Sequence, residues 1–317
     1  MTQTKYTFLL PAYKPDFFEE ALRSIKTQTF SDFKVLVSDD CSPHDLKSIF
    51  DKVCGDDERF AYRRNEENMG GKSLVSHWNL LVDMCDTEYL ILASDDDVYE
   101  KTFLEEVDKL ARKYPEVDLI RARVRRLDGK ETLEEDSVRK EYESQIEFLF
   151  NSCKVVQIPC IGNYVFRKSA LQNIGGFYDF PLAWGSDEVT TNEVSKNGVA
   201  ITTEIEFSFR WSGKNISTIE DDNTLRKKLE ARKKVCLFYR DFFAKISSGG
   251  SLWQNKMLCA AKNCFTQKTY DSIFHYFQVL SFVELIDLIS FLNKNKIIQN
   301  KRDSFYILKY WIRKRIL

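Results

Sequence analysis

The first 115 residues alternate short apolar runs with segments of helical periodicity, and this alternation limits the possible folds more than any other feature. Parallel strands cannot be joined by a tight turn, so strands that alternate with helices form crossover units. The sequence therefore predicts an α/β fold with a mostly parallel sheet flanked by helices. Strand-like runs stand at 7–10, 33–37, 60–62 and 89–93, and helical patterns at 17–25, 46–53, 73–84 and 103–111.

Beyond residue 115 the alternation loosens, and after Thr224 the pattern is helical almost without a break. We expect an α/β domain over 1–220 and a C-terminal helical region over 221–317. The expected strands are 117–124, 163–166 and 199–209, and the expected helices are 141–150, 189–196, 225–243, 252–265, 273–292 and 305–317.

The balance of charge excludes one class of partner. The 317 residues carry 47 basic and 48 acidic side chains, so the formal net charge is −1 and a general nucleic-acid binder is not expected. The eight cysteines form no Cys-x-x-Cys pair, which indicates reduced thiols rather than a zinc site. No apolar run is as long as the roughly 18 residues that a spanning helix needs, and no apolar signal segment opens the chain. We expect a cytoplasmic protein.

Acidic residues follow two of the predicted strands directly. Asp39 and Asp40 come after the strand that ends at Val37, and three consecutive aspartates, 95–97, come after the strand that ends at Ala93. Ligands of open parallel sheets bind beyond the carboxyl ends of strands. Adjacent carboxylates repel each other unless a cation lies among them, and Mg²⁺ or Mn²⁺ prefers such oxygen ligands. Turns and helix caps use the same residues, so from the residues alone a turn and a metal site remain equal alternatives.

Several blocks of the sequence, taken in order, resemble family 2 glycosyltransferases of the GT-A fold, a Rossmann-like fold that binds nucleotide-diphospho-sugars. The similarity spans about residues 5–217. The blocks are 11–13, 28–33, 37–42, 68–71 with Asn79, 94–97, 163–167, 175–177, 186–188 and 209–217.

The resemblance implies a nucleotide-sugar donor, with uridine as the favoured nucleoside. Asp40 would accept a hydrogen bond from the imide N–H of uracil, with Asp39 in support. The remaining residues of the expected nucleotide site are Pro11, Ala12, Tyr13, Gly70, Lys72, Asn79 and Asp95.

The resemblance also implies a metal ion and a general base. Asp96, with Asp97, would hold Mn²⁺ or Mg²⁺ between the two phosphates, and the run of aspartates leaves Asp95 as an alternative register. Asp187 matches the base that takes the proton from the acceptor hydroxyl, so that direct displacement inverts the anomeric centre. If the helix is shifted by one residue, Glu188 takes this role. As an isolated residue, Asp187 fits a helix N-cap equally well.

Two residues depart from the family pattern. Lys14 stands where an Asn is usual, and Ser186 stands where the Glu of a Glu-Asp pair is common. The expected activity is that of an inverting, metal-dependent transferase in bacterial-type surface polysaccharide or glycan synthesis, with a glycan or lipid-linked acceptor. One alternative is a non-catalytic module that binds nucleotide-sugar or glycan. The other, a sugar nucleotidyltransferase, needs a Gly-rich basic loop after the first strand, which 11–15 does not provide.

The C-terminal residues are amphipathic and basic. Such a helix binds an anionic membrane surface, here the inner face, or packs on its own domain with a solvated basic face, and both interpretations stay open. Helices rich in Phe and Tyr also suggest a homodimer. The apolar positions are Phe305, Ile307, Leu308, Trp311, Ile312 and Ile316, and the basic ones Lys309, Arg313, Lys314 and Arg315.

Overall fold

The N-terminal half forms the parallel sheet that its sequence predicts. The structure, a computed structural model, describes residues 4–154, 156–213, 215–246, 250–298 and 301–316. The first four strands lie in the order β3-β2-β1-β4, and all are parallel. Their bounds are β1 (Tyr6–Ala12), β2 (Phe33–Asp39), β3 (Phe60–Arg64) and β4 (Tyr89–Leu92), and the helices among them are α1 (Phe18–Lys26), α2 (Leu46–Cys54), α3 (Leu74–Met84) and α4 (Phe103–Lys113).

The second half makes the ten-stranded sheet a mixed one. β9 (Tyr164–Arg167) runs antiparallel between β4 and β6 (Leu119–Asp128), and β6 pairs in parallel with β10 (Val199–Arg210). The sheet is therefore mostly parallel only in its N-terminal half. Three short antiparallel strands were not predicted, since two to five residues carry little periodic signal. They are β5 (Val98–Tyr99), β7 (Glu131–Glu135) and β8 (Tyr142–Glu143).

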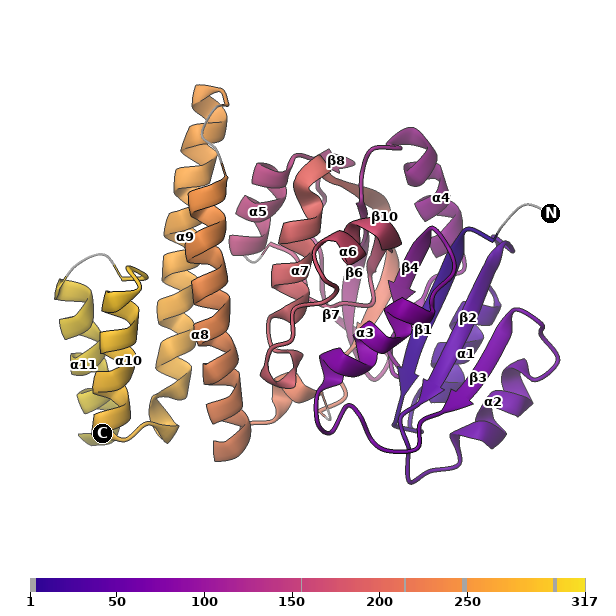
Figure 1. The fold of residues 1–317 in the computed structure, drawn as a ribbon, viewed down its shortest axis with the longest axis horizontal. Coiled ribbons are helices and arrows are strands. Elements are labelled where there is room, and N and C mark those ends of the chain that lie inside the picture. Colours follow the sequence, from indigo (N-terminus) through magenta and orange to yellow (C-terminus); the bar gives the residue numbers. More distant parts are fainter. Residues whose placement is uncertain (1–3, 155, 214, 247–249, 299–300, 317) are drawn as a thin grey trace.

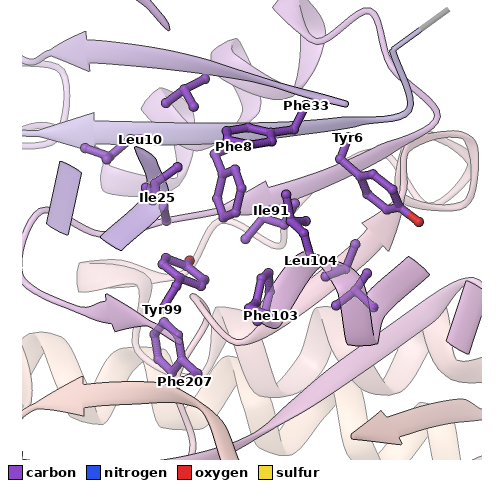
Figure 2. Packing of buried hydrophobic residues seen from close by; sticks show 14 of the residues in the cluster. Tyr6, Phe8, Leu10, Ile25, Phe33, Ile91, Tyr99, Phe103, Leu104 and Phe207 are labelled. Atoms are coloured by element: carbon purple, nitrogen blue, oxygen red, sulfur yellow. The ribbon is translucent and has the colours of Figure 1, made fainter. Parts of the chain in front are cut away.

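Apolar side chains cover both faces of the sheet, as a parallel sheet requires. On one face, Phe8 of β1 packs against Tyr99 and Phe103 beneath α1 and α4, with ring centroids 5.1 and 6.1 Å away (Figure 2). Leu9 points to the other face, where it joins Trp78 of α3. This alternation along β1 holds the strand in register and fixes where its carboxyl end emerges.

Seven α-helices of the described residues lie between or after the later strands. α8 and α9 form a long antiparallel pair between the sheet and the α10–α11 hairpin (Figure 1). Leu149 of α5 and Val189 of α7 share one buried cluster with Tyr239 and Phe265, so the helical region packs on these two helices. The bounds are α5 (Gln145–Cys153), α6 (Lys168–Asn173), α7 (Ser186–Val194), α8 (Asp222–Lys245), α9 (Leu252–Tyr276), α10 (Phe282–Lys294) and α11 (Lys301–Ile316).

Two helix predictions need correction. The segment 141–150 begins as β8, and α5 starts only after Ser144, which forms a capping box with Glu147. The predicted break between 265 and 273 does not exist, because Thr269 and Ile273 continue the buried face of α9. The chain breaks instead between α9 and α10, where Ser281 caps α10. The prediction of a boundary near residue 220 agrees with the N-cap of α8 at Asp221 but is not tested further.

Some apolar residues of α11 pack on the rest of the protein, and others are exposed. Ile307 is buried, and the indole Nε1 of Trp311 donates to the carbonyl of Leu280 at 3.1 Å, so this side packs on the body. Phe305 and Tyr310 are more than half exposed. The side chains of Arg315 and Ile316 and the whole of Leu317 lie outside the described residues. None of the described helices is both long and apolar enough to cross a bilayer.

Candidate active site

A cavity of about 840 Å³ opens at the carboxyl ends of β1, β2 and β4. The loops after these strands form one wall, and residues of α7, α8 and α9 form the opposite wall. Asp40, Asp96 and Asp187 all line this cavity, although they are up to 147 positions apart in the chain (187 − 40). Asp40 and Asp96 follow strand ends, as the sequence argument expects, whereas Asp187 comes from α7.

Asp40 is held by donors from the segment that follows β3. Its Oδ1 accepts from the Asn65 side chain at 2.8 Å and the Met69 amide at 2.9 Å, and its Oδ2 accepts from the Gly70 amide at 2.7 Å. Each carboxylate oxygen has two lone pairs, so one acceptor position remains on Oδ2. A Cβ at position 70 would lie 2.8 Å from that oxygen, which explains why a glycine stands there.

Asp39 supports this turn from behind and does not line the cavity. Its carboxylate accepts from the Ser42 amide at 2.7 Å and the Tyr62 hydroxyl at 2.6 Å, and it pairs with Arg64. These contacts fix the turn that carries Asp40. Asp39 is placed where it can support Asp40. Because it does not line the cavity, it is not placed to contact a nucleotide directly.

Two further predicted nucleotide residues also lie away from the cavity lining. Asn79 binds both backbone groups of Phe177, donating to its carbonyl at 3.0 Å and accepting from its amide at 2.8 Å. Lys72 is exposed and pairs with Glu67 at 2.6 Å. Asn79 therefore joins α3 to the 175–177 turn, and nothing in the fold directs Lys72 to a phosphate.

Asp95 ties the loop after β1 to the end of β4. Its Oδ2 accepts from the backbone amides of Tyr13 and Lys14 at 2.8 and 2.7 Å. The Lys14 ammonium contacts Asp96 and lies 3.5 Å from the Asp95 carboxylate. Burial alone would lower the pKa of Lys14, but the two carboxylates raise it overall. Lys14, the departure from the family pattern, is thus the cation that the aspartate run holds. Pro11, Ala12 and Tyr13 line the cavity beside it.

Asp97 completes the run from a more buried position. Its Oδ1 accepts from the Arg210 amide at 2.9 Å, and the Ser94 hydroxyl donates to its Oδ2. Burial and repulsion by Asp96 raise the pKa of Asp97 to about 7. A positive charge among these aspartates would therefore be favourable.

The aspartates fit a cation that is shared with a ligand. Among the described residues, no three His, Cys, Asp or Glu side chains are arranged to hold a metal by themselves. Mg²⁺ commonly takes one or two carboxylates and completes its shell with phosphate oxygens and water. Asp96 and Asp97 can offer that donor set if Lys14 gives way at Asp96, because each Asp97 oxygen accepts one hydrogen bond, whereas one Asp95 oxygen accepts two from the loop after β1.

Asp187 lies in the first turn of α7, directly beside α8. Gly185, with φ of 83°, precedes the helix, and a Cβ there would lie 2.7 Å from the Val235 side chain, so glycine allows α8 to approach. Asp187 makes no ion pair with any described residue. Burial raises the pKa of its carboxyl to about 6. Gly185, and not Asp187, is the N-cap residue of α7, and backbone amides of the first turn partly offset the effect of burial on the pKa of Asp187.

Glu188, the alternative base, is already paired. Its Oε2 accepts from the Lys268 ammonium at 2.9 Å. Burial tends to raise its pKa, but Lys268 and Arg232 lower it overall. A carboxylate held in this way is a weaker base than the unpaired Asp187. The geometry therefore favours Asp187 of the two.

Residues missed by the sequence analysis complete the cavity. Cys160 lines the cavity, and burial, together with the charges of nearby acids that include Asp97 and Asp187, raises the pKa of its thiol. Arg232 and Lys268 have ordinary helical spacing, so only their position in the fold identifies them, whereas Trp211 and Ser217 lie in the block 209–217 but were given no role. The others include Trp184, Trp211, Ser217, Arg232 and Lys268.

Comparisons with known proteins identify the fold and the family. The curated GalNAc(5)-diNAcBac-PP-undecaprenol beta-1,3-glucosyltransferase of Campylobacter jejuni is 31% identical over 94 residues, which are 29% of this chain and only 30% of that protein. S. aureus TarS 1–349 in complex with UDP-GlcNAc has a TM-score of 0.59 at 14% identity, covering 92% of this chain and 88% of that one. Its complex with UDP has a TM-score of 0.56 at the same identity and coverage.

The structural likeness shows the GT-A fold, and the sequence shows the family. The sequence model described as "Glycosyl transferase family 2" matches residues 7–175, just over half of the chain. This span contains both strand-end acid clusters, Asp39–Asp40 and 95–97. The chain belongs to glycosyl transferase family 2.

Proposed function

We propose that this protein transfers a sugar from a nucleotide-diphosphate donor to an acceptor hydroxyl with inversion at the anomeric carbon. The observation that carries the proposal is that Asp40, Asp96 and Asp187 line one cavity. Its volume of about 840 Å³ is in the range of small-molecule sites and leaves room for a donor and one acceptor group.

Asp40 is proposed to bind the base of a uridine nucleotide. The free acceptor position on its Oδ2 suits the imide N–H of uracil, and Tyr13, 41% exposed, lines the cavity beside it. The TarS structures, which share this fold, hold UDP-GlcNAc and UDP. A cytosine has no N–H at that ring position and would be rejected.

Asp96 and Asp97 are proposed to hold Mn²⁺ or Mg²⁺ together with the donor's diphosphate. The cation would neutralise charge on the departing nucleoside diphosphate. Asp95 keeps the loop after β1 in place, and Lys14 supplies positive charge at the same cluster.

Asp187 is proposed to take the proton from the acceptor hydroxyl as its oxygen attacks the anomeric carbon. A carboxyl with a pKa of about 6 is ionised at neutral pH and is more basic than an ordinary aspartate, which suits a general base. Direct displacement of this kind breaks the bond to the diphosphate and inverts the anomeric centre.

We propose a glycan or lipid-linked acceptor at the inner face of the cytoplasmic membrane. The α10–α11 surface exposes apolar side chains beside basic ones, which fits an anionic bilayer. Flotation with vesicles containing phosphatidylglycerol should recover the protein, and a Lys309→Glu/Arg313→Glu variant should float several-fold less. Failure to float, with dimeric elution, would indicate a homodimer instead. The exposed residues are Phe282, Val283, Phe305, Tyr306, Tyr310, Lys309, Arg313 and Lys314.

The function is tested by mixing the protein with Mn²⁺, a panel of UDP-sugars and candidate acceptors, and measuring UDP release. Asp187→Asn should reduce turnover by about 10²-fold or more, as removal of a general base does. Glu188→Gln is the matched control, because it changes the neighbouring carboxyl. A non-catalytic module would bind UDP but release none in either protein.

A further inference from the structure

We propose that the α8–α9 wall of the cavity holds a subsite for an anionic oxygen group of the acceptor, a phosphate or a carboxylate, with Arg232 as its principal ligand. This inference rests on the proposed function, since it concerns the acceptor that Asp187 would deprotonate. It goes further by specifying what the acceptor must carry besides its hydroxyl.

Arg232 is a buried cation with unused donors. Only 6% of the residue is exposed, yet it lines the cavity. Among the described residues, its Nη2 donates to the Thr269 hydroxyl at 3.2 Å, and its buried Nε has no hydrogen-bond partner. No carboxylate of the described residues lies within ion-pair distance of it. Buried charges are normally paired, yet this guanidinium makes no ion-pair contact with a described carboxylate, and Glu188 acts on it only from a longer distance.

Glu188 does not form an ion pair with Arg232. Glu188 is bound by Lys268 at 2.9 Å and makes no contact of ion-pair length with Arg232. The Phe265 ring lies 5.3 Å from the guanidinium carbon and restricts its orientation. The planar fork of an arginine matches the geometry of phosphate and carboxylate oxygens, which makes these groups the best fit for its free edge.

A second unpartnered donor comes from a separate element. The Ser217 Oγ is buried without a hydrogen-bond partner, and this residue also lines the cavity. It lies against α8, because the Lys228 ammonium donates to its backbone carbonyl at 3.3 Å. Arg232 and Ser217 thus both line the cavity, and each has a buried polar atom without a hydrogen-bond partner among the described residues.

At this end of the cavity Lys268 is already paired, whereas Arg232 is not. The Lys268 ammonium contacts Glu188 at 2.9 Å, but no carboxylate of the described residues contacts the Arg232 guanidinium. Lys228 does not line the cavity, and its ammonium donates to the carbonyls of Ser217 and Ile219. A bound anion would therefore pair with Arg232. An acceptor anchored there has its reactive hydroxyl on the side of Asp187, whereas a neutral acceptor would leave the guanidinium unpaired.

The test compares the wild type with Arg232→Gln, Ser217→Ala and the control Arg240→Gln. Arg240 is an exposed residue of the same helix, so the control removes the same charge away from the cavity. Binding of glycerol 1-phosphate and of glucuronate is measured by calorimetry at constant ionic strength, and binding of UDP with Mn²⁺ is measured in parallel. The two anions distinguish a phosphate-bearing from a carboxylate-bearing acceptor.

We expect the wild type and Arg240→Gln to bind at least one of these anions. Arg232→Gln should bind it about 10-fold more weakly and Ser217→Ala about 3-fold more weakly, with UDP affinity unchanged within about 2-fold. If Arg232→Gln does not fold, Arg232→Lys replaces it, which keeps the charge and loses the fork. Equal anion affinity in all proteins, or none in the wild type, would overturn the subsite. If the wild type does not bind UDP with Mn²⁺, the proposed function is refuted instead.

Discussion

Asp187→Asn should make the protein more stable while it makes it inactive. The carboxyl of this α7 residue is partly buried at the cavity and makes no ion pair with a described cation, so its ionised form is disfavoured in the folded state. Its pKa is about 6 in the fold, against an ordinary value of 3.8. The difference, 6 − 3.8, corresponds to at most about 3 kcal/mol, and contact with the open cavity reduces the expected gain to about 1–2 kcal/mol.

The sign of this effect depends on pH. Because the pKa of Asp187 is raised in the folded state, its ionisation destabilises the fold fully above about pH 6 and ceases to do so below about pH 4. Asparagine cannot ionise. The stability advantage of Asp187→Asn should therefore be present at pH 7.5 and vanish on acidification to pH 4. Wild-type turnover should fall as pH drops through about 6, because the base becomes protonated.

Urea unfolding of both proteins at pH 7.5 and pH 4, with UDP release measured alongside, checks the reasoning. A structural aspartate that caps a helix would give the opposite result, since its loss costs about 1 kcal/mol. If Asp187→Asn is less stable than the wild type at pH 7.5, or retains turnover within about 3-fold, then Asp187 is not a buried base.

Three further substitutions test other parts of the site. Gly70→Ala brings a Cβ within 2.8 Å of the carboxylate proposed to bind uracil, so UDP affinity measured by calorimetry should fall about 10-fold with little loss of stability; unchanged affinity would contradict the role of Asp40. Lys14→Met removes the ammonium from the aspartate run, so binding of Mn²⁺ alone, followed by electron paramagnetic resonance, should tighten about 10-fold, whereas weaker binding would show that the aspartates do not hold the metal. Asn79→Ala loses two hydrogen bonds to the backbone and should cost about 2–3 kcal/mol in urea unfolding while UDP affinity stays the same; a selective loss of UDP binding would restore it as a nucleotide ligand.

The sequence predicts where the strand-end aspartates lie, because their position follows from the order and direction of the strands. An apolar strand followed by aspartate predicts both where the strand ends and what it presents, as at Val37 and Ala93. β1, β2 and β4 are parallel neighbours, so their ends meet at one edge without any further information.

The remaining parts depend on contacts that no local pattern encodes. Asn79 resembles a ligand in sequence, but its partner, Phe177, lies 98 positions away. Arg232 occupies an unremarkable helical position, and only the docking of α8 beside α7 brings it to the cavity. α9 was predicted to break where polar residues accumulate, yet burial of Thr269 keeps it continuous.

A crystal structure of Asp187→Asn with UDP and Mn²⁺ tests the central claim most directly. We predict uracil at Asp40, the cation on Asp96 or Asp97 together with the diphosphate, and the side chain at position 187 facing the space where the sugar would lie. A nucleotide bound outside this cavity, or a diphosphate remote from the aspartate run, would contradict the account.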